Sequence, residues 1–359
     1  MMKWKSIIEG NNKKLVCDKI DEIAATLINK NFTGHDNSLM YGNMGIAIFL
    51  FYYYKWKERN SVYKKASMLM MSIFDDLNKR IHLHKLDMSN EDLSFRKGLC
   101  GIGWGINHLV KNNFIDCDIQ ETMCLVDASI YREMIMCIQN SKEALYQNAF
   151  DICRYAVSRD DRLSKEYLRR FVNELYELPV PFFHNDIGKL LPLLYKIHNK
   201  YPDIELVEKL YDNALSNIDI YKCNLTTLLF LAVNTNYKKM ALEQLLKSGD
   251  MLMGGISDSR VDKGLEHGII LELYSSNLIY QNLDIPVYRN IIEECVMRLF
   301  EIPMNKTVMN NAFWATSSLG LWSIHYGLLN GLAGMGLSLL SVVSECEVLW
   351  DDVWNEIFC

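Results

Sequence analysis

The chain has little proline and no excess of positive charge. It contains 6 Pro and 19 Gly in 359 residues, and half of its residues are apolar. This composition excludes a mostly disordered protein, because so many apolar side chains can bury a large core. The formal net charge of −6 disfavours a nucleic acid as the main partner, since phosphate-binding surfaces usually need a basic excess.

The sequence also lacks a cysteine framework and a signal segment. Its ten cysteines form no CxxC pair, and Met1–Asn12 does not resemble a cleavable signal. These absences predict the reducing cytoplasm, where most thiols, including Cys100, are small apolar core residues. Only Lys55–Lys65 is locally basic and aromatic, and we expect it to form a solvated helix end and loop.

One stretch without charge could be mistaken for a membrane span. Phe313–Ser344 contains no Asp, Glu, Lys or Arg. However, it contains His325, several glycines and several serines, and no basic cluster flanks it to set an orientation. A helix surrounded by other helices has the same apolar character. We therefore predict a buried helix and no membrane span.

A repeated pattern is the most informative feature of the sequence. In three segments, glycines three residues apart precede a long apolar run: Tyr41–Tyr54, Lys97–Val110 and Asn330–Val343. We call the first such glycine the anchor, and four weaker copies add further anchors. The seven anchors are Gly42, Gly98, Asn148, Asn185, Leu225, Gly268 and Gly331.

The spacing of the anchors predicts helical hairpins. Successive anchors lie between 37 and 63 residues apart, and two helices with their connections need about 35–50 residues. Each repeat would pair an inner apolar helix with an outer amphipathic one, such as Lys19–Asn29 or Glu205–Leu215. No run of alternating strand pattern is present. We predict an all-α fold, a single α/α toroid of about seven repeats over residues 1–359, in which the first repeat covers the apolar last one.

Equivalent positions of the repeats converge in a ring. The residues just before the anchors include His184, Cys223, Glu266 and His267. Each would lie at a helix start, where unpaired N–H groups favour anions such as thiolates. These four residues form one candidate constellation, although each could also be an ordinary core or helix-capping side chain.

The phrases GLCGIGWG and GLLNGLAGMGLSLL resemble the inner-helix motifs of the lanthionine synthetase C-like (LanC-like) family. The resemblance runs over nearly the whole chain. It implies a toroid of seven repeats that binds zinc and adds a peptide cysteine thiolate to a dehydroamino acid, closing a thioether ring. It also implies zinc ligands at Cys223, Glu266 and His267, and an acid toward the enolate at His184.

The sequence departs from the family at this implied site. Where the family has Trp–Cys–x–Gly, the chain has Lys222–Cys223–Asn224–Leu225, and where the family has Cys–His–Gly, it has Glu266–His267–Gly268. A Cys/Glu/His set can still hold zinc and leave a position open for substrate. An oxygen donor in place of sulfur should make the bound thiolate less nucleophilic.

Three functions therefore remain open. The first is a peptide cyclase with an altered zinc site. The second is a LanC-like protein without catalytic activity that binds a precursor peptide with its leader, or a partner such as a peptide dehydratase or another maturation enzyme. The third is a carbohydrate-active barrel that uses paired carboxylates such as Asp186 and Glu266. Fold alone does not decide among them.

Overall fold

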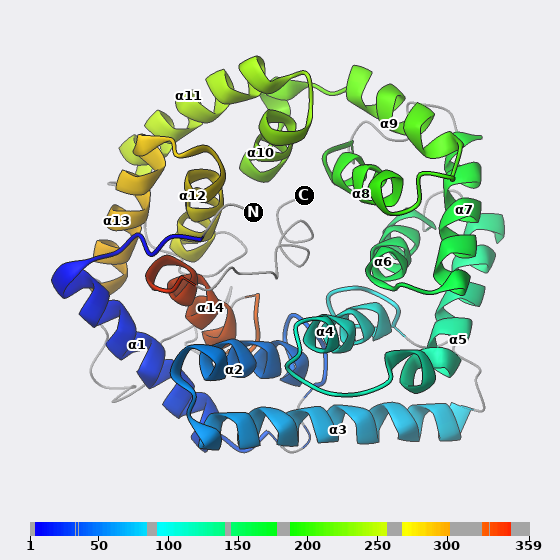
Figure 1. Ribbon diagram of the computed structural model, residues 1–359, viewed down its shortest axis with the longest axis horizontal. Helices are drawn as coiled ribbons and strands as arrows, with labels where there is room; N and C mark the ends of the chain where they lie inside the picture. The colour runs from blue at the N-terminus through cyan, green and yellow to red at the C-terminus, as the bar shows by residue number, and fades with distance from the viewer. Residues whose placement is uncertain are drawn as a thin grey trace, which may run out of the picture. The chain divides into compact units, whose positions relative to one another are not determined.

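The structure is a computed structural model in which every described element is helical (Figure 1). It describes residues 4–32, 34, 36–84, 92–140, 145–177, 187–256, 268–301, 325–329 and 331–345. No strand occurs within these ranges. The all-α prediction is confirmed for this part of the chain.

The described helices follow one another along the chain. Their bounds are α1 Gly10–Asn29, α2 Asn43–Lys57, α3 Asn60–His84, α4 Leu99–Lys111, α5 Ile119–Asn140, α6 Leu145–Ser158, α7 Arg162–Tyr176, α8 Ile187–Lys200, α9 Leu206–Ser216, η2 Ile220–Lys222, α10 Leu225–Asn234, α11 Lys238–Ile256, α12 Ile269–Leu283, α13 Pro286–Glu301 and α14 Leu332–Val343.

The helices group into two compact units. Unit 1 comprises 1–35, 41–69 and 220–358, and unit 2 comprises 36–40 and 70–219 together with residue 359. In unit 1 the apolar helices α10, α12, α14 and α2 contact one another in that order, and α11, α13 and α1 pack against them as a second row (Figure 1). In unit 2 the corresponding rows are α4, α6, α8 and α5, α7, α9. Both units are thus two-layered stacks of helical hairpins.

The first repeat packs directly on the last one within unit 1. Helix α14 contacts both α1 and α2, although hundreds of residues separate them in the sequence. All residues of α14 are buried, from Leu332 to Val343. The prediction that the first repeat covers the apolar last helix is therefore confirmed.

The anchors mark where the apolar helices begin. Gly42, Gly98, Gly268 and Gly331 are the N-cap residues of α2, α4, α12 and α14. Two anchors were misplaced. The N-cap of α10 is Asn224 instead of Leu225, because its side chain accepts a hydrogen bond from the Thr227 N–H. Helix α6 begins at Leu145, so Asn148 lies inside its first turn. Asn185 lies outside the described residues.

Glycine is needed here for close approach, since the φ angles of these N-caps suit any residue. At Gly331, a Cβ atom would lie 2.6 Å from the Gly327 carbonyl oxygen. The turn before α14 folds back at this point, and its carbonyls at His325, Tyr326 and Gly327 accept hydrogen bonds from the first N–H groups of the helix. The chain therefore caps α14 with its own backbone.

Helix contacts in the apolar row leave equally little space. A Cβ atom at Gly336 in α14 would lie 2.7 Å from Phe49 Cζ in α2. We expect Gly336→Ala to lower the free energy of unfolding by about 1–3 kcal/mol, because the buried Phe49 ring must shift to admit the new methyl group. The matched control is Gly254→Ala in α11, where nothing lies within 4 Å of the new atom. That change should stabilise the helix by about 0.5–1 kcal/mol, as measured by urea unfolding.

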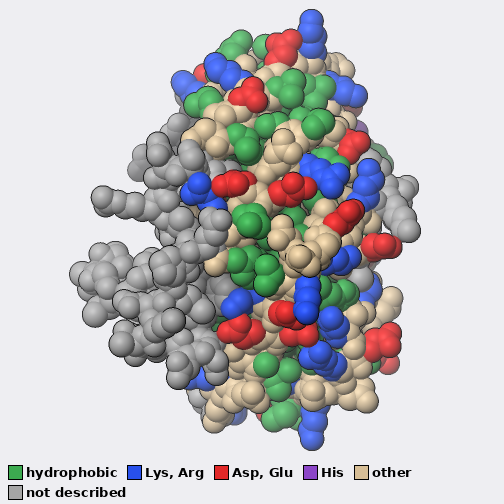
Figure 2. All heavy atoms as spheres, turned by 90° about the vertical axis from the view of Figure 1, so that its left-hand side faces the viewer, with side chains coloured by type: hydrophobic (Ala, Val, Ile, Leu, Met, Phe, Trp, Pro, Cys, Tyr) green, Lys and Arg blue, Asp and Glu red, His purple; other side chains and the backbone are tan. Residues whose placement is uncertain are grey.

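The outer row of unit 1 presents a mixed surface. Figure 2 shows hydrophobic side chains scattered among Lys, Arg, Asp and Glu on this side. Helix α13 of this row carries ion pairs along its length, such as Arg289–Glu293 at 3.1 Å and Arg298–Glu294 at 2.7 Å. Among the described residues, no helix is both long and apolar enough to cross a membrane.

Candidate functional site

Neighbouring apolar helices of unit 1 contact one another through their middle turns. Asn277 in α12 and Ser341 in α14 both lie in the third turn of their helices, and the Asn277 amide donates to Ser341 Oγ at 2.8 Å. Phe49 and Gly336 meet in the second turns of α2 and α14. Helix α14 therefore packs between α12 and α2.

Cys223 is the predicted site residue that the structure describes. It is half-buried between η2 and α10, and its backbone N–H donates to the Ile220 carbonyl at 3.3 Å. The next residue, Asn224, caps α10 by accepting from Thr227 N at 2.8 Å and Thr226 Oγ1 at 2.9 Å. The hydrogen bond to Ile220 and the Asn224 cap thus hold the Cys223 backbone at the start of the helix.

The other predicted residues lie outside the described part of the chain. These are His184, Glu266 and His267, together with Asp186 of the carbohydrate hypothesis. Gly268, directly after His267, is described as the N-cap of α12, and α10 packs against α12. No group of three or more metal-ligating side chains occurs among the described residues, which include only one of the three predicted ligands.

Apolar and aromatic side chains of η2 and α10 remain accessible. Tyr221 is 73% exposed, and Val233 at the far end of α10 is 49% exposed. Leu229 and Phe230 on the same helix are half-buried. This pattern contrasts with α14, where every residue is buried. Helix α10 therefore combines an apolar composition with a surface that a ligand could reach.

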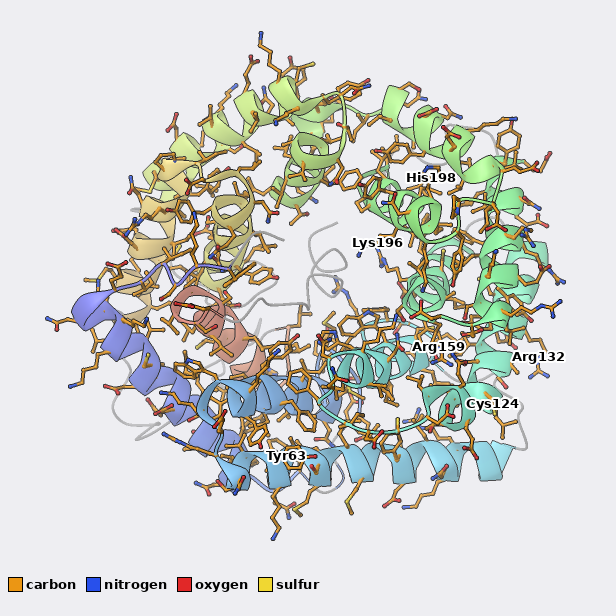
Figure 3. The ribbon with its side chains drawn as sticks, viewed as in Figure 1. Tyr63, Cys124, Arg132, Arg159, Lys196 and His198 are labelled. Atoms are coloured by element: carbon orange, nitrogen blue, oxygen red, sulfur yellow. The ribbon has the colours of Figure 1, made fainter. Side chains whose placement is uncertain are left out.

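Three of the seven described cysteines are core residues. Cys100, Cys153 and Cys295 are buried, and burial raises the pKa of the Cys153 and Cys295 thiols. The packing role predicted for Cys100 is confirmed. Cys124 on α5 is exposed (Figure 3), so the expectation of a core position is wrong for this residue.

Unit 2 contains a buried polar network that no sequence motif predicts. Arg159, labelled in Figure 3, follows α6 and is completely buried. Its Nη2 atom donates to Asp127 Oδ2 at 2.7 Å, and the Tyr155 hydroxyl donates to Asp127 Oδ1. Burial raises the pKa of the Asp127 carboxyl, while the Arg159 guanidinium opposes this rise. Arg159 lies in the polar run Ser158–Arg162, and nothing in the sequence of this run predicts a buried side chain.

Asp151 lies three residues after the anchor Asn148, where the repeat pattern has its second glycine. It is buried in α6 and accepts a hydrogen bond from the Phe95 backbone N–H at 2.9 Å. Arg154 lies 3.3 Å from the other carboxylate oxygen. Asp151 therefore fixes the turn that precedes α4, which is a structural role that the repeat pattern did not indicate.

Comparison with known proteins identifies part of this architecture. Residues 7–179 match the family model described as Lanthionine synthetase C-like protein. No curated protein matches the sequence.

The matched residues belong to the lanthionine synthetase C-like family. The LanC-like region contains the glycine-capped helices α2 and α4 and ends within the segment that leads to α8. Cys223, Glu266 and His267 follow it in the sequence, as does His184. The family match thus covers the helical repeats that begin the chain, and the candidate zinc ligands lie beyond it.

Proposed function

We propose that the protein closes thioether rings in a peptide, with zinc held by Cys223, Glu266 and His267. The position of Cys223 supports this proposal most directly. It stands at the start of α10, one repeat before Glu266 and His267, which precede α12, and α10 and α12 pack together. The LanC-like match over residues 7–179 agrees with such a function.

The chemistry of the three side chains suits zinc. Thiolate sulfur, imidazole nitrogen and carboxylate oxygen are all accepted zinc ligands, and three protein ligands leave a position for substrate. Zinc bound there would lower the pKa of an incoming peptide thiol, as it does for bound water. Neighbouring Asn224 and η2 orient the Cys223 backbone, and His184 would deliver a proton to the enolate carbon that ring closure leaves.

The substrate would be a precursor peptide. Ring closure adds the sulfur of a peptide cysteine to the β-carbon of a dehydroalanine or dehydrobutyrine, and the thiol proton is balanced by the proton that enters the α-carbon. The dehydroamino acid must come from a dehydrating enzyme, which is a natural partner. Exposed side chains here suit contact with a peptide. They include Val233 of α10 and Tyr221, which lies just before this helix.

Zinc content tests the metal site. We expect about one zinc per purified chain, and Cys223→Ala should weaken zinc binding by more than about 100-fold, because losing a ligand exceeds the roughly 10–100-fold effect of losing a second-shell partner. Cys17→Ala is the matched control, since Cys17 is also a half-buried cysteine of unit 1. Glu266→Cys should raise the affinity. Protein that takes up no zinc at neutral pH contradicts the metal site.

Ring closure tests the reaction. A dehydrated peptide with one cysteine should lose its free thiol without a change in mass, and Cys223→Ala should abolish this loss. A second candidate function, peptide binding without catalysis, is favoured by the exposed Tyr221 and Val233. A protein that binds the peptide, retains zinc and never consumes the thiol would support that second function and contradict the first.

A further inference from the structure

An irregular N-terminal segment joins the first and last repeats of unit 1. Residues Trp4–Glu9 precede α1 and form no helix. Ile7 and Ile8 are buried, at 3% and 2% exposure. We call Trp4–Glu9 the clasp.

The clasp completes the hydrogen bonding of the last turn of α14. The carbonyls of a final helical turn have no partner inside the helix. Here the Ser341 carbonyl accepts from Trp4 Nε1 at 2.8 Å, and the Val343 carbonyl accepts from Ser6 Oγ at 3.1 Å. The Val342 carbonyl accepts from the N–H groups of both Ile7 and Ile8, at 2.9 and 3.1 Å.

The clasp also binds α12 through one side chain. Gln281 Oε1 accepts from the Lys5 N–H at 3.0 Å, and its Nε2 atom donates to the Lys5 carbonyl at 2.7 Å. A single glutamine therefore pairs with both backbone groups of Lys5, as a neighbouring strand would. The clasp is bonded to α12 and α14 and continues directly into α1.

We propose that release of the clasp is the conformational change that opens the contact between the first and last repeats. The two helices of a hairpin in unit 1 are joined by a short turn, such as the connection from α12 to α13. The contact of α14 with α1 and α2 has no such direct link, so it can separate locally while the helices stay folded. Opening frees the Val342 and Val343 carbonyls and removes the Trp4 bond to the Ser341 carbonyl at the same time, which makes it a cooperative step.

Hydrogen exchange of the full-length protein tests the proposal. Gln281→Ala should raise the exchange rates of the Ile7 and Ile8 amides about tenfold, because it removes both bonds to Lys5. Trp4→Phe keeps an aromatic ring, removes the donor to Ser341 and should accelerate the same amides. The matched control is Asn282→Ala, since the Asn282 amide donates to the Leu278 carbonyl of its own helix at 2.9 Å.

The pattern of exchange decides the outcome. A rise confined to the clasp and to the last turn of α14 supports local opening. Unchanged Ile7 and Ile8 amides in both variants overturn the proposal. An equal rise in the amides of α10 and α11 also overturns it, because that result means global unfolding. None of these readouts depends on zinc or on ring closure.

Discussion

Arg159→Met is expected to lower the free energy of unfolding by about 3–5 kcal/mol, the largest single effect that we predict. The guanidinium is completely buried and donates to Asp127 Oδ2 at 2.7 Å. Its removal leaves the Asp127 carboxylate, only 4% exposed, without its charged partner. A buried charge without a partner is far more costly than the lost bond itself.

The same guanidinium connects several elements of unit 2. Its Nη2 atom also lies 3.3 Å from the Ile119 carbonyl and from Gln120 Oε1 at the start of α5. Its Nε atom lies 3.6 Å from the carboxylate of Asp161, the N-cap of α7. Since a domain is stable by only about 5–15 kcal/mol, the variant should unfold at a much lower urea concentration.

Two further variants identify the cause of this loss. Arg170→Met removes an exposed arginine of α7 that pairs with Glu166 at 3.3 Å, and it should cost less than about 1 kcal/mol. Adding Asp127→Asn to Arg159→Met should recover part of the loss, because the buried charge is removed while the Tyr155 hydroxyl keeps an acceptor. An Arg159→Met protein as stable as Arg170→Met would contradict the assignment.

The repeats could be predicted from the sequence because they depend on local patterns. Glycine followed by a long apolar run predicted α2, α4 and α14, since close backbone approach and burial on all sides leave few alternatives. The middle repeats were harder to predict, because side-chain hydrogen bonds take the place of glycine there. Asn224 caps α10 through its side chain, and Asp151 binds the Phe95 backbone. Such roles depend on tertiary contacts that no local pattern records.

The candidate site was predictable only in part for the same reason. The repeat order indicated that Cys223 precedes an apolar helix, and the structure places it there, before α10. Whether His184, Glu266 and His267 join it stays a prediction, because they lie outside the described residues. The clasp and the Arg159 network could not be predicted, because their partners are far apart in the sequence and are paired only by packing.

His108 should make the protein less stable in mild acid. This histidine of α4 is buried and stacks on Trp104, with ring centroids 4.7 Å apart. Burial lowers the pKa of the His108 imidazole from 6.5 to about 3. The unfolded chain therefore takes up a proton near pH 6.5, whereas the folded protein stays neutral at this position until about pH 3.

This difference in proton binding gives the direction and size of the effect. The contribution of His108 to stability is complete above pH 6.5 and falls as the pH decreases toward 3. Between pH 7 and pH 5 the loss should be about 2 kcal/mol, since each pKa unit corresponds to about 1.4 kcal/mol. The measurement is urea unfolding at a series of pH values across this range.

His108→Asn tests whether this imidazole causes the slope. Asparagine keeps a polar group near Asn112, whose amide lies 3.4 Å from His108 Nδ1, but it cannot take up a proton. The variant should be less stable than the parent at pH 7 because it fills less of the buried site, and it should lose about 2 kcal/mol less on going to pH 5. An unchanged slope in His108→Asn would show that other groups govern the acid sensitivity.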